Sequence, residues 1–222
     1  MKKIVVAFCV SEVAKWKAQS LYDELQETAE YTPIIYVYPS PLEFNQEVSG
    51  ELLLEEKIKF FKKKNMKVTS VWDSVAQKCI IPRDSRPDII FYQQPWDIPP
   101  FLPPHEIADY ALSFYIPYYL VNNFNINMEF GLYMHHYVYR YIVQNEEAAK
   151  LFTSMLNRKY YAGKCIGLGH TIIDSLTKNI SPNNANSVIY APHFSIPFKK
   201  CIKKGERFVF FEPFAFFIEI SS

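Results

Sequence analysis

Glycine is scarce in this sequence, with 6 residues among 222, against a usual share of about 7%. Glycine-rich loops cradle phosphate groups because glycine lets the backbone approach them closely. The scarcity therefore argues against such a loop. An excess of positive charge is also missing, since 24 Lys and Arg residues balance 23 Asp and Glu residues and leave a formal net charge of +1. A protein that grips a nucleic-acid backbone needs a strong positive field, so we expect no nucleic-acid partner.

Paired cysteines are lacking as well. The four cysteines are scattered and form no CxxC pair. No histidine stands near them at the spacing of zinc ligands, so the pattern predicts neither a disulfide framework nor a metal site, and it favours a cytoplasmic protein. Cys9 and Cys165 lie within apolar runs and are predicted to be small core residues.

The sequence has no long apolar run. The longest uncharged stretch, residues 110–128, contains Pro117 and four asparagines, which are costly in hydrocarbon. Two lysines followed by residues 4–10 imitate a signal peptide, but Glu12 and Lys15 come directly after this short run. We therefore expect a buried first strand and no membrane-spanning helix.

What the sequence does have is apolar surface: 49% of its residues are hydrophobic and 21% are charged. This composition indicates a globular protein with a core. Short segments rich in β-branched and aromatic residues predict seven strands, at residues 4–10, 33–38, 67–72, 88–92, 111–115, 139–143 and 164–168. Amphipathic patterns predict helices at residues 13–29, 51–65, 145–157 and 172–176.

The order of these segments predicts the fold class. The strand segments are apolar throughout, which is typical of parallel strands covered on both faces, and helices separate them. We therefore expect an α/β fold with a Rossmann-like, doubly wound parallel sheet over residues 1–178. Residues 179–186 are polar and turn-rich, and predict a linker. Residues 187–222 are too few for a core of their own, so we expect an incomplete second domain, in a chain truncated or frame-shifted after about Arg207.

Four segments carry a family resemblance. They are Pro-Asp-Ile-Ile-Phe-Tyr-Gln-Gln-Pro-Trp-Asp at residues 87–97, Phe-Tyr-Ile-Pro-Tyr at 114–118, Gly-Leu-Gly-His at 167–170 with Asp174, and Val-Ile-Tyr-Ala-Pro-His at 188–193. In this order they resemble the CDP-glycerol glycerophosphotransferases, bacterial enzymes that build teichoic-acid and capsule polymers on two Rossmann domains in the GT-B arrangement. The resemblance covers roughly residues 2–196.

The resemblance implies a transferase that needs no cofactor. Its partners would be CDP-glycerol or a related nucleotide-activated donor and a polyol-phosphate or glycan acceptor, and family members often work at the cytoplasmic face of the membrane. The family motif Gln-x-Trp-His-Gly matches Gln94 and Trp96, with Asp97 in the position of the histidine base. A carboxylate with an ordinary pKa of ~3.9 is a weaker base. Either Asp97 takes over, or the acceptor differs, or the register is shifted.

Further candidates follow other predicted strands. Tyr115, Tyr118 and Asn122 are predicted to line an acceptor groove, with core packing or a turn as the alternative. His170 is either a substrate contact or a packing histidine, because the arginine of the family's neighbouring motif is absent. The resemblance assigns the donor diphosphate to His193 and Ser195.

Two histidines and the C-terminal residues complete the sequence-based hypotheses. His135 and His136 are adjacent on a helix, so their rings diverge and we expect structural roles. A nucleotide-sugar glycosyltransferase of the GT-B type is an alternative function. So is a non-catalytic Rossmann-like module that binds a partner through the aromatic residues 208–217. We expect no transferase activity from the 222-residue chain alone.

Overall fold

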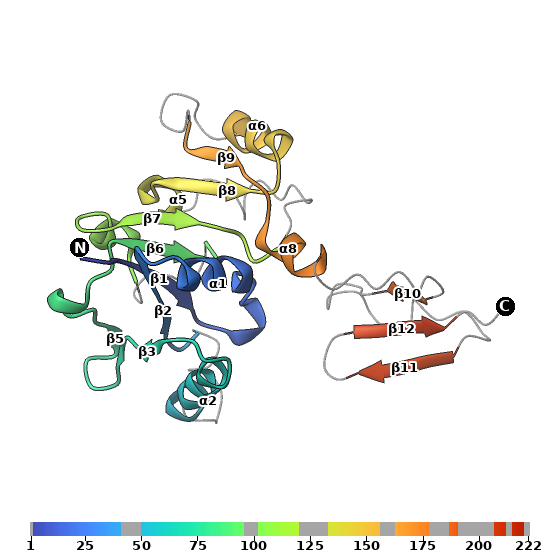
Figure 1. The fold of residues 1–222 in the computed structure, drawn as a ribbon, viewed down its shortest axis with the longest axis horizontal. Helices are drawn as coiled ribbons and strands as arrows, with labels where there is room; N and C mark the ends of the chain where they lie inside the picture. Colours follow the sequence, from blue (N-terminus) through green and yellow to red (C-terminus); the bar gives the residue numbers. More distant parts are fainter. Residues whose placement is uncertain are drawn as a thin grey trace. The chain divides into compact units, whose positions relative to one another are not determined.

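The computed structural model describes residues 2–40, 50–95, 102–119, 133–155, 163–177, 187–190, 207–211 and 215–219. The chain divides into two compact units, Met1–Thr177 and Lys178–Ser222. The first unit contains the large sheet, whose strands lie side by side in Figure 1.

All neighbouring strands in the large sheet are parallel. The seven strands are β1 (Ile4–Val10), β2 (Tyr31–Val37), β3 (Val68–Ser70), β6 (Ile89–Tyr92), β7 (Leu112–Tyr115), β8 (Arg140–Val143) and β9 (Cys165–Gly167). Their order is β3-β2-β1-β6-β7-β8-β9, so the chain builds outward from β1 in one direction and from β6 in the other. This reversal defines a doubly wound sheet and confirms the predicted α/β, Rossmann-like fold.

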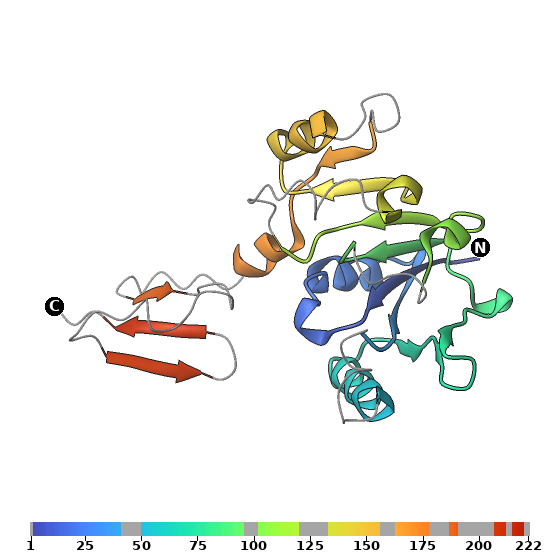
Figure 2. The ribbon, with the colours of Figure 1, turned by 180° about the vertical axis from the view of Figure 1, so that it is seen from behind.

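Helices cover the two faces of this sheet. They are α1 (Gln19–Glu27), α2 (Gly50–Lys63), α3 (Pro104–Ile107), α5 (Tyr133–Tyr137), α6 (Glu146–Met155) and α8 (Thr171–Thr177). One core joins alternate residues of the strands, such as Val6 and Phe8, to side chains of α1 and α2. The other core joins the intervening residues, such as Ala7 and Cys9, to α3, α5 and α6. Figure 2 shows the same layers from behind.

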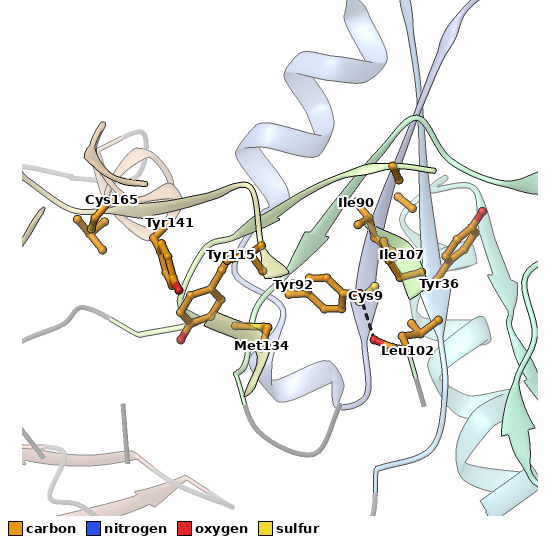
Figure 3. Close-up of a cluster of buried hydrophobic side chains, with 14 of the residues drawn as sticks. Cys9, Tyr36, Ile90, Tyr92, Leu102, Ile107, Tyr115, Met134, Tyr141 and Cys165 are labelled. Atoms are coloured by element: carbon orange, nitrogen blue, oxygen red, sulfur yellow. Dashed lines mark hydrogen bonds between the residues drawn. The ribbon is translucent and has the colours of Figure 1, made fainter. Parts of the chain in front are cut away.

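Tyrosines fill much of the second core. Tyr92, Tyr115 and Tyr141 come from three neighbouring strands and are almost fully buried (Figure 3). The Tyr92 hydroxyl donates a hydrogen bond to the carbonyl of Leu102, at 3.1 Å. The phenol rings thus contribute buried apolar area, and the Tyr92 hydroxyl keeps a hydrogen-bond partner inside the core. Cys9 and Cys165 are buried, as predicted.

The first helix begins later than predicted. Residues Val13–Lys15 form a short 3-10 turn, η1, and the α-helix starts only at Gln19 and ends at Glu27. Between them Trp16 is extended and buried, with its ring centroid 5.6 Å from that of Phe8 and 5.4 Å from that of Phe61. Burial of this large aromatic side chain outweighs continuation of the helix.

A small hairpin was not predicted from the sequence. Strands β4 (Trp72–Asp73) and β5 (Lys78–Cys79) are antiparallel, with two residue pairs between them. The Asp73 side chain accepts hydrogen bonds from the backbone N–H groups of Val75 and Ala76, each at 2.9 Å, and so closes the turn.

The second unit contains a three-stranded antiparallel sheet in the order β10-β12-β11. Its strands are β10 (Ser187–Tyr190), β11 (Arg207–Phe211) and β12 (Ala215–Glu219). Strand β10 begins at residue 187, where the second domain is predicted to start. In the part of the chain that the structure describes, no helix has the length and apolar character needed to cross a bilayer.

Candidate functional site

The carboxyl ends of β1 and β6 meet where the strand order reverses. These two strands are parallel neighbours, but one leads toward β2 and the other toward β7. In open α/β sheets the crossovers then leave in opposite directions, and ligands bind in the crevice between them. Here Ser11 and Glu12 follow β1, and Gln93 and Gln94 follow β6.

Gln93 is the central polar residue of this region. It is only 5% exposed, and its Oε1 accepts a hydrogen bond from the backbone N–H of Lys17 at 3.0 Å. Because Lys17 donates, the acceptor oxygen must face it, which fixes the orientation of the amide. The other end, Nε2, is buried and has no acceptor among the described residues. Burying a donor without a partner costs about 1–3 kcal/mol of folding free energy. Gln93 therefore carries a hydrogen-bond donor that no described residue uses.

The segment after β7 lies against Gln93. The backbone N–H of Tyr118 donates to the carbonyl of Gln93 at 3.0 Å. The Tyr118 ring also faces a cation, since Lys15 Nζ lies 5.6 Å from its centroid. The same Lys15 Nζ donates to Glu12 Oε1 at 2.6 Å. The connection after β1 and the segment after β7 therefore contact each other, and both form hydrogen bonds with Gln93.

His170 connects the end of β9 to the same edge of the sheet. Its Nε2 donates to the carbonyl of Pro117 at 2.7 Å, and its Nδ1 accepts from the backbone N–H of Ile172 at 3.1 Å. This pattern requires the neutral ring with its proton on Nε2. Burial lowers the pKa of His170 from its ordinary value and so favours the neutral form, partly opposed by its hydrogen bond to Pro117. Both ring nitrogens are thus engaged within the protein.

The structure brings three of the predicted site residues to one edge. Gln94 is buried directly after β6, Tyr118 follows β7, and His170 follows β9. Tyr115 lies instead in the core, with its ring centroid 6.2 Å from that of Tyr141. The remaining predicted residues, Trp96, Asp97, Asn122, His193 and Ser195, lie outside the described residues. Their roles stay predictions.

Lys15 and Glu12 were missed as site residues in the sequence. The signal that points to them is their position: Ser-Glu-Val-Ala-Lys stands directly after the first strand, where a dinucleotide-binding fold carries its glycine-rich loop. Gln93 belongs to the family-like segment 87–97, but its hydrogen bond with Lys17 joins residues 76 positions apart, which local sequence does not reveal.

A cavity lies elsewhere, on the face of β1–β3 that carries Ile34 and Tyr36, beside the β4–β5 hairpin. Its volume is about 930 Å³. Polar groups in its lining bond to one another: the Tyr36 hydroxyl donates to the Ser85 carbonyl at 2.7 Å, and the Trp72 N–H donates to Ser70 Oγ at 3.1 Å. These groups are satisfied without a ligand, so we place the candidate site at Gln93.

The described residues contain no group of three or more His, Cys, Asp or Glu side chains that could hold a metal ion. The segments that follow β1, β6 and β7 carry an ammonium group, a buried amide donor and an aromatic ring, from Lys15, Gln93 and Tyr118. Groups of these kinds are suited to binding a hydroxylated or anionic molecule. No model of a known protein family matches this chain, and no curated protein matches it significantly.

Proposed function

We propose that this chain binds the acceptor of a transferase related to the CDP-glycerol glycerophosphotransferases, as the first Rossmann-like domain of the GT-B arrangement. The observation that carries the proposal is the buried Gln93 Nε2 at the carboxyl end of β6, a donor that has no acceptor among the described residues. A polyol or glycan hydroxyl oxygen entering the crevice would accept a hydrogen bond from it. This hydrogen bond would add much to the binding free energy, because the Gln93 donor is already desolvated and oriented.

The proposed reaction is a phosphoryl transfer. In an intact transferase with a complete second domain, an acceptor hydroxyl oxygen would attack the β-phosphorus of CDP-glycerol, forming the new O–P bond while the P–O bond to CMP breaks. Asp97 receives the hydroxyl proton, and His193 and Ser195 contact the donor diphosphate. Catalysis of this kind depends mainly on positioning the hydroxyl in line with the leaving group. In this scheme Gln93, Gln94 and Tyr118 hold the acceptor, and a lipid-linked acceptor would bring the protein to the membrane surface.

The test is ligand binding by the full chain, measured by calorimetry or NMR titration with glycerol, sn-glycerol 3-phosphate, CDP-glycerol and UDP-glucose. Gln93→Glu keeps an oxygen for the Lys17 N–H but removes the amide donor. We expect the wild type to bind glycerol and its phosphate, and Gln93→Glu to bind both at least ten-fold more weakly. Preferred binding of UDP-glucose over CDP-glycerol would favour the nucleotide-sugar transferase.

The matched control is Gln77→Glu. It makes the same chemical change on an exposed residue of the β4–β5 hairpin, so it changes the net charge equally but leaves the crevice intact. We expect the control to bind as the wild type does. If Gln93→Glu also binds as the wild type does, the acceptor does not use this donor and the proposal fails.

A further inference from the structure

We propose that the cavity between strands β1–β3 and the β4–β5 hairpin is a second binding site, which takes an uncharged and largely apolar small molecule. This site is separate from the proposed acceptor site, because neither Gln93 nor Tyr118 lines the cavity. Its ligand is therefore a different molecule from the polyol or glycan acceptor.

The cavity results from the way the chain connects β3 to β6. In a doubly wound sheet such a crossover usually carries a helix that packs on the sheet. Here residues 71–88, all of which the structure describes, contain the β4–β5 hairpin and a 3-10 turn, η3 (Arg83–Ser85), but no α-helix (Figure 1). The cavity beside them measures about 930 Å³. Small-molecule sites commonly measure about 300–1,000 Å³, so a ligand of that size can enter.

The sheet side of the cavity is apolar. Val5, Ile34 and Val71 line it and belong to the second core or pack against it. The Tyr36 hydroxyl, on the same face of the sheet, already has a hydrogen-bond partner within the protein. Polar ligand atoms would lose their hydration here without gaining a partner, so this side favours apolar atoms. Ile80 adds an apolar wall that is 41% exposed, and a ligand can reach it from the solvent.

The charged residues that line the cavity balance one another. Lys67 and Arg86 are positive, and Asp73 and Asp84 are negative. The Arg86 guanidinium lies over the Tyr110 ring, 4.2 Å from its centroid, and the Asp73 carboxylate accepts two backbone N–H groups of its own turn. The lining therefore exerts no net attraction on an anion or on a cation. A charged ligand would be desolvated without an added counter-charge, so the site selects an uncharged one.

The experiment titrates the full chain with two fluorescent dyes that share one ring system. N-phenyl-1-naphthylamine is uncharged, and 8-anilinonaphthalene-1-sulfonate carries a negative charge. We expect one equivalent of the uncharged dye to bind, with at least five-fold higher affinity than the sulfonate. The indole N–H signal of Trp72, which lines the cavity, should shift in NMR spectra, while that of Trp16 in the other core stays in place. The variant Trp72→Phe identifies the signal.

The variant Thr69→Phe fills the cavity. Thr69 is exposed, lines the cavity and is paired in register with Tyr36, so its side chain lies on the same face of the sheet. We expect Thr69→Phe to bind the uncharged dye at least ten-fold more weakly. The control, Val75→Phe, adds the same ring at a position that is 94% exposed and outside the lining, and it should bind as the wild type does.

Three outcomes would overturn the proposal. They are equal affinities of Thr69→Phe and Val75→Phe, an unchanged Trp72 signal, and a sulfonate affinity equal to that of the uncharged dye. Should Thr69→Phe fail to fold, Ile80→Ser at an exposed position replaces it and should weaken binding at least three-fold. Glycerol binding tests the Gln93 site separately, so failure of this proposal and failure of the proposed function are distinguishable.

Discussion

His135 shows how strongly the core controls a single side chain. It lies on α5, is fully buried, and its ring centroid is 5.1 Å from that of Tyr141 and 5.8 Å from that of Tyr115. Burial, together with the smaller effect of the neighbouring His136, lowers the pKa of His135 to about 4. The imidazole is therefore neutral in the folded protein, in agreement with the structural role expected from the sequence.

This pKa predicts a loss of stability in acid. In the unfolded chain His135 has an ordinary pKa of ~6.5. From there down to about 4 the unfolded state binds more protons than the folded state, so the free energy of unfolding falls as the pH falls. We expect this residue to account for up to about 3 kcal/mol of the loss between pH 7 and pH 4. Urea unfolding measured across this range checks the prediction.

The comparison variant is His135→Phe, which keeps a ring beside Tyr141 but cannot titrate. Its stability should depend less on pH than that of the wild type in this window. The same substitution at the exposed His136 should keep most of the pH dependence of the wild type, because burial is the larger cause of the lowered pKa. Parallel profiles for the wild type and His135→Phe would show that His135 does not titrate differently on folding.

At the scale of single residues, the sequence predicts which residues follow a strand better than it predicts what their side chains contact. Gln94, Tyr118 and His170 were predicted from their positions after strands, and parallel strands bring such positions to one edge. Gln93 and Tyr115 depend on contacts distant in the sequence: the bond to Lys17, and the packing against Tyr141. Both faces of β7 carry an aromatic residue, Phe114 on one and Tyr115 on the other, so alternation alone does not tell which ring is buried.

At the scale of elements, His170 fastens α8 to the segment after β7. It caps the helix through Nδ1 and holds the Pro117 carbonyl through Nε2. We expect His170→Ala to lower the free energy of unfolding by about 2–3 kcal/mol, since it removes the cap and leaves the carbonyl without its donor. His170→Asn should recover about 1 kcal/mol, because asparagine also caps helices. Urea unfolding measures both values, and equal losses would contradict the capping role.

Element prediction succeeded where local pattern decides and failed where distant packing decides. Each of the seven strands of the large sheet falls on a segment predicted from its β-branched and aromatic residues. The predicted start of α1, at residue 13, was wrong because Trp16 packs against Phe61, which lies 45 residues along the chain. The need for glycine at the end of β9 is also not visible in the local sequence. A Cβ on Gly167 would lie 2.3 Å from the backbone carbon of Asn145, so a larger residue would collide with a segment that only the fold brings close.

At the scale of the whole molecule, the large sheet and its helices form a self-contained unit. Among the residues whose side chains the structure describes, both hydrophobic cores consist of residues before Thr177, the last residue of α8. Helix α8 itself belongs to this unit, since Ser20 Oγ on α1 donates to Asp174 Oδ2 at 3.1 Å.

Residues 1–177 alone should accordingly keep the fold of the first unit. We expect this shortened chain to have a midpoint of thermal unfolding within about 4 °C of the corresponding transition of the full chain, a difference of roughly 1 kcal/mol. A chain of residues 1–168 is the control, because it lacks α8 and His170 and so loses the bonds to Ser20 and Pro117. It should unfold at a clearly lower temperature, since a lost cap and a lost buried hydrogen bond each cost about 1 kcal/mol or more. Circular dichroism during heating follows all three chains. A large loss of stability in residues 1–177 would show that the second unit supports the sheet, and the boundary after Thr177 would then not separate two independently stable parts.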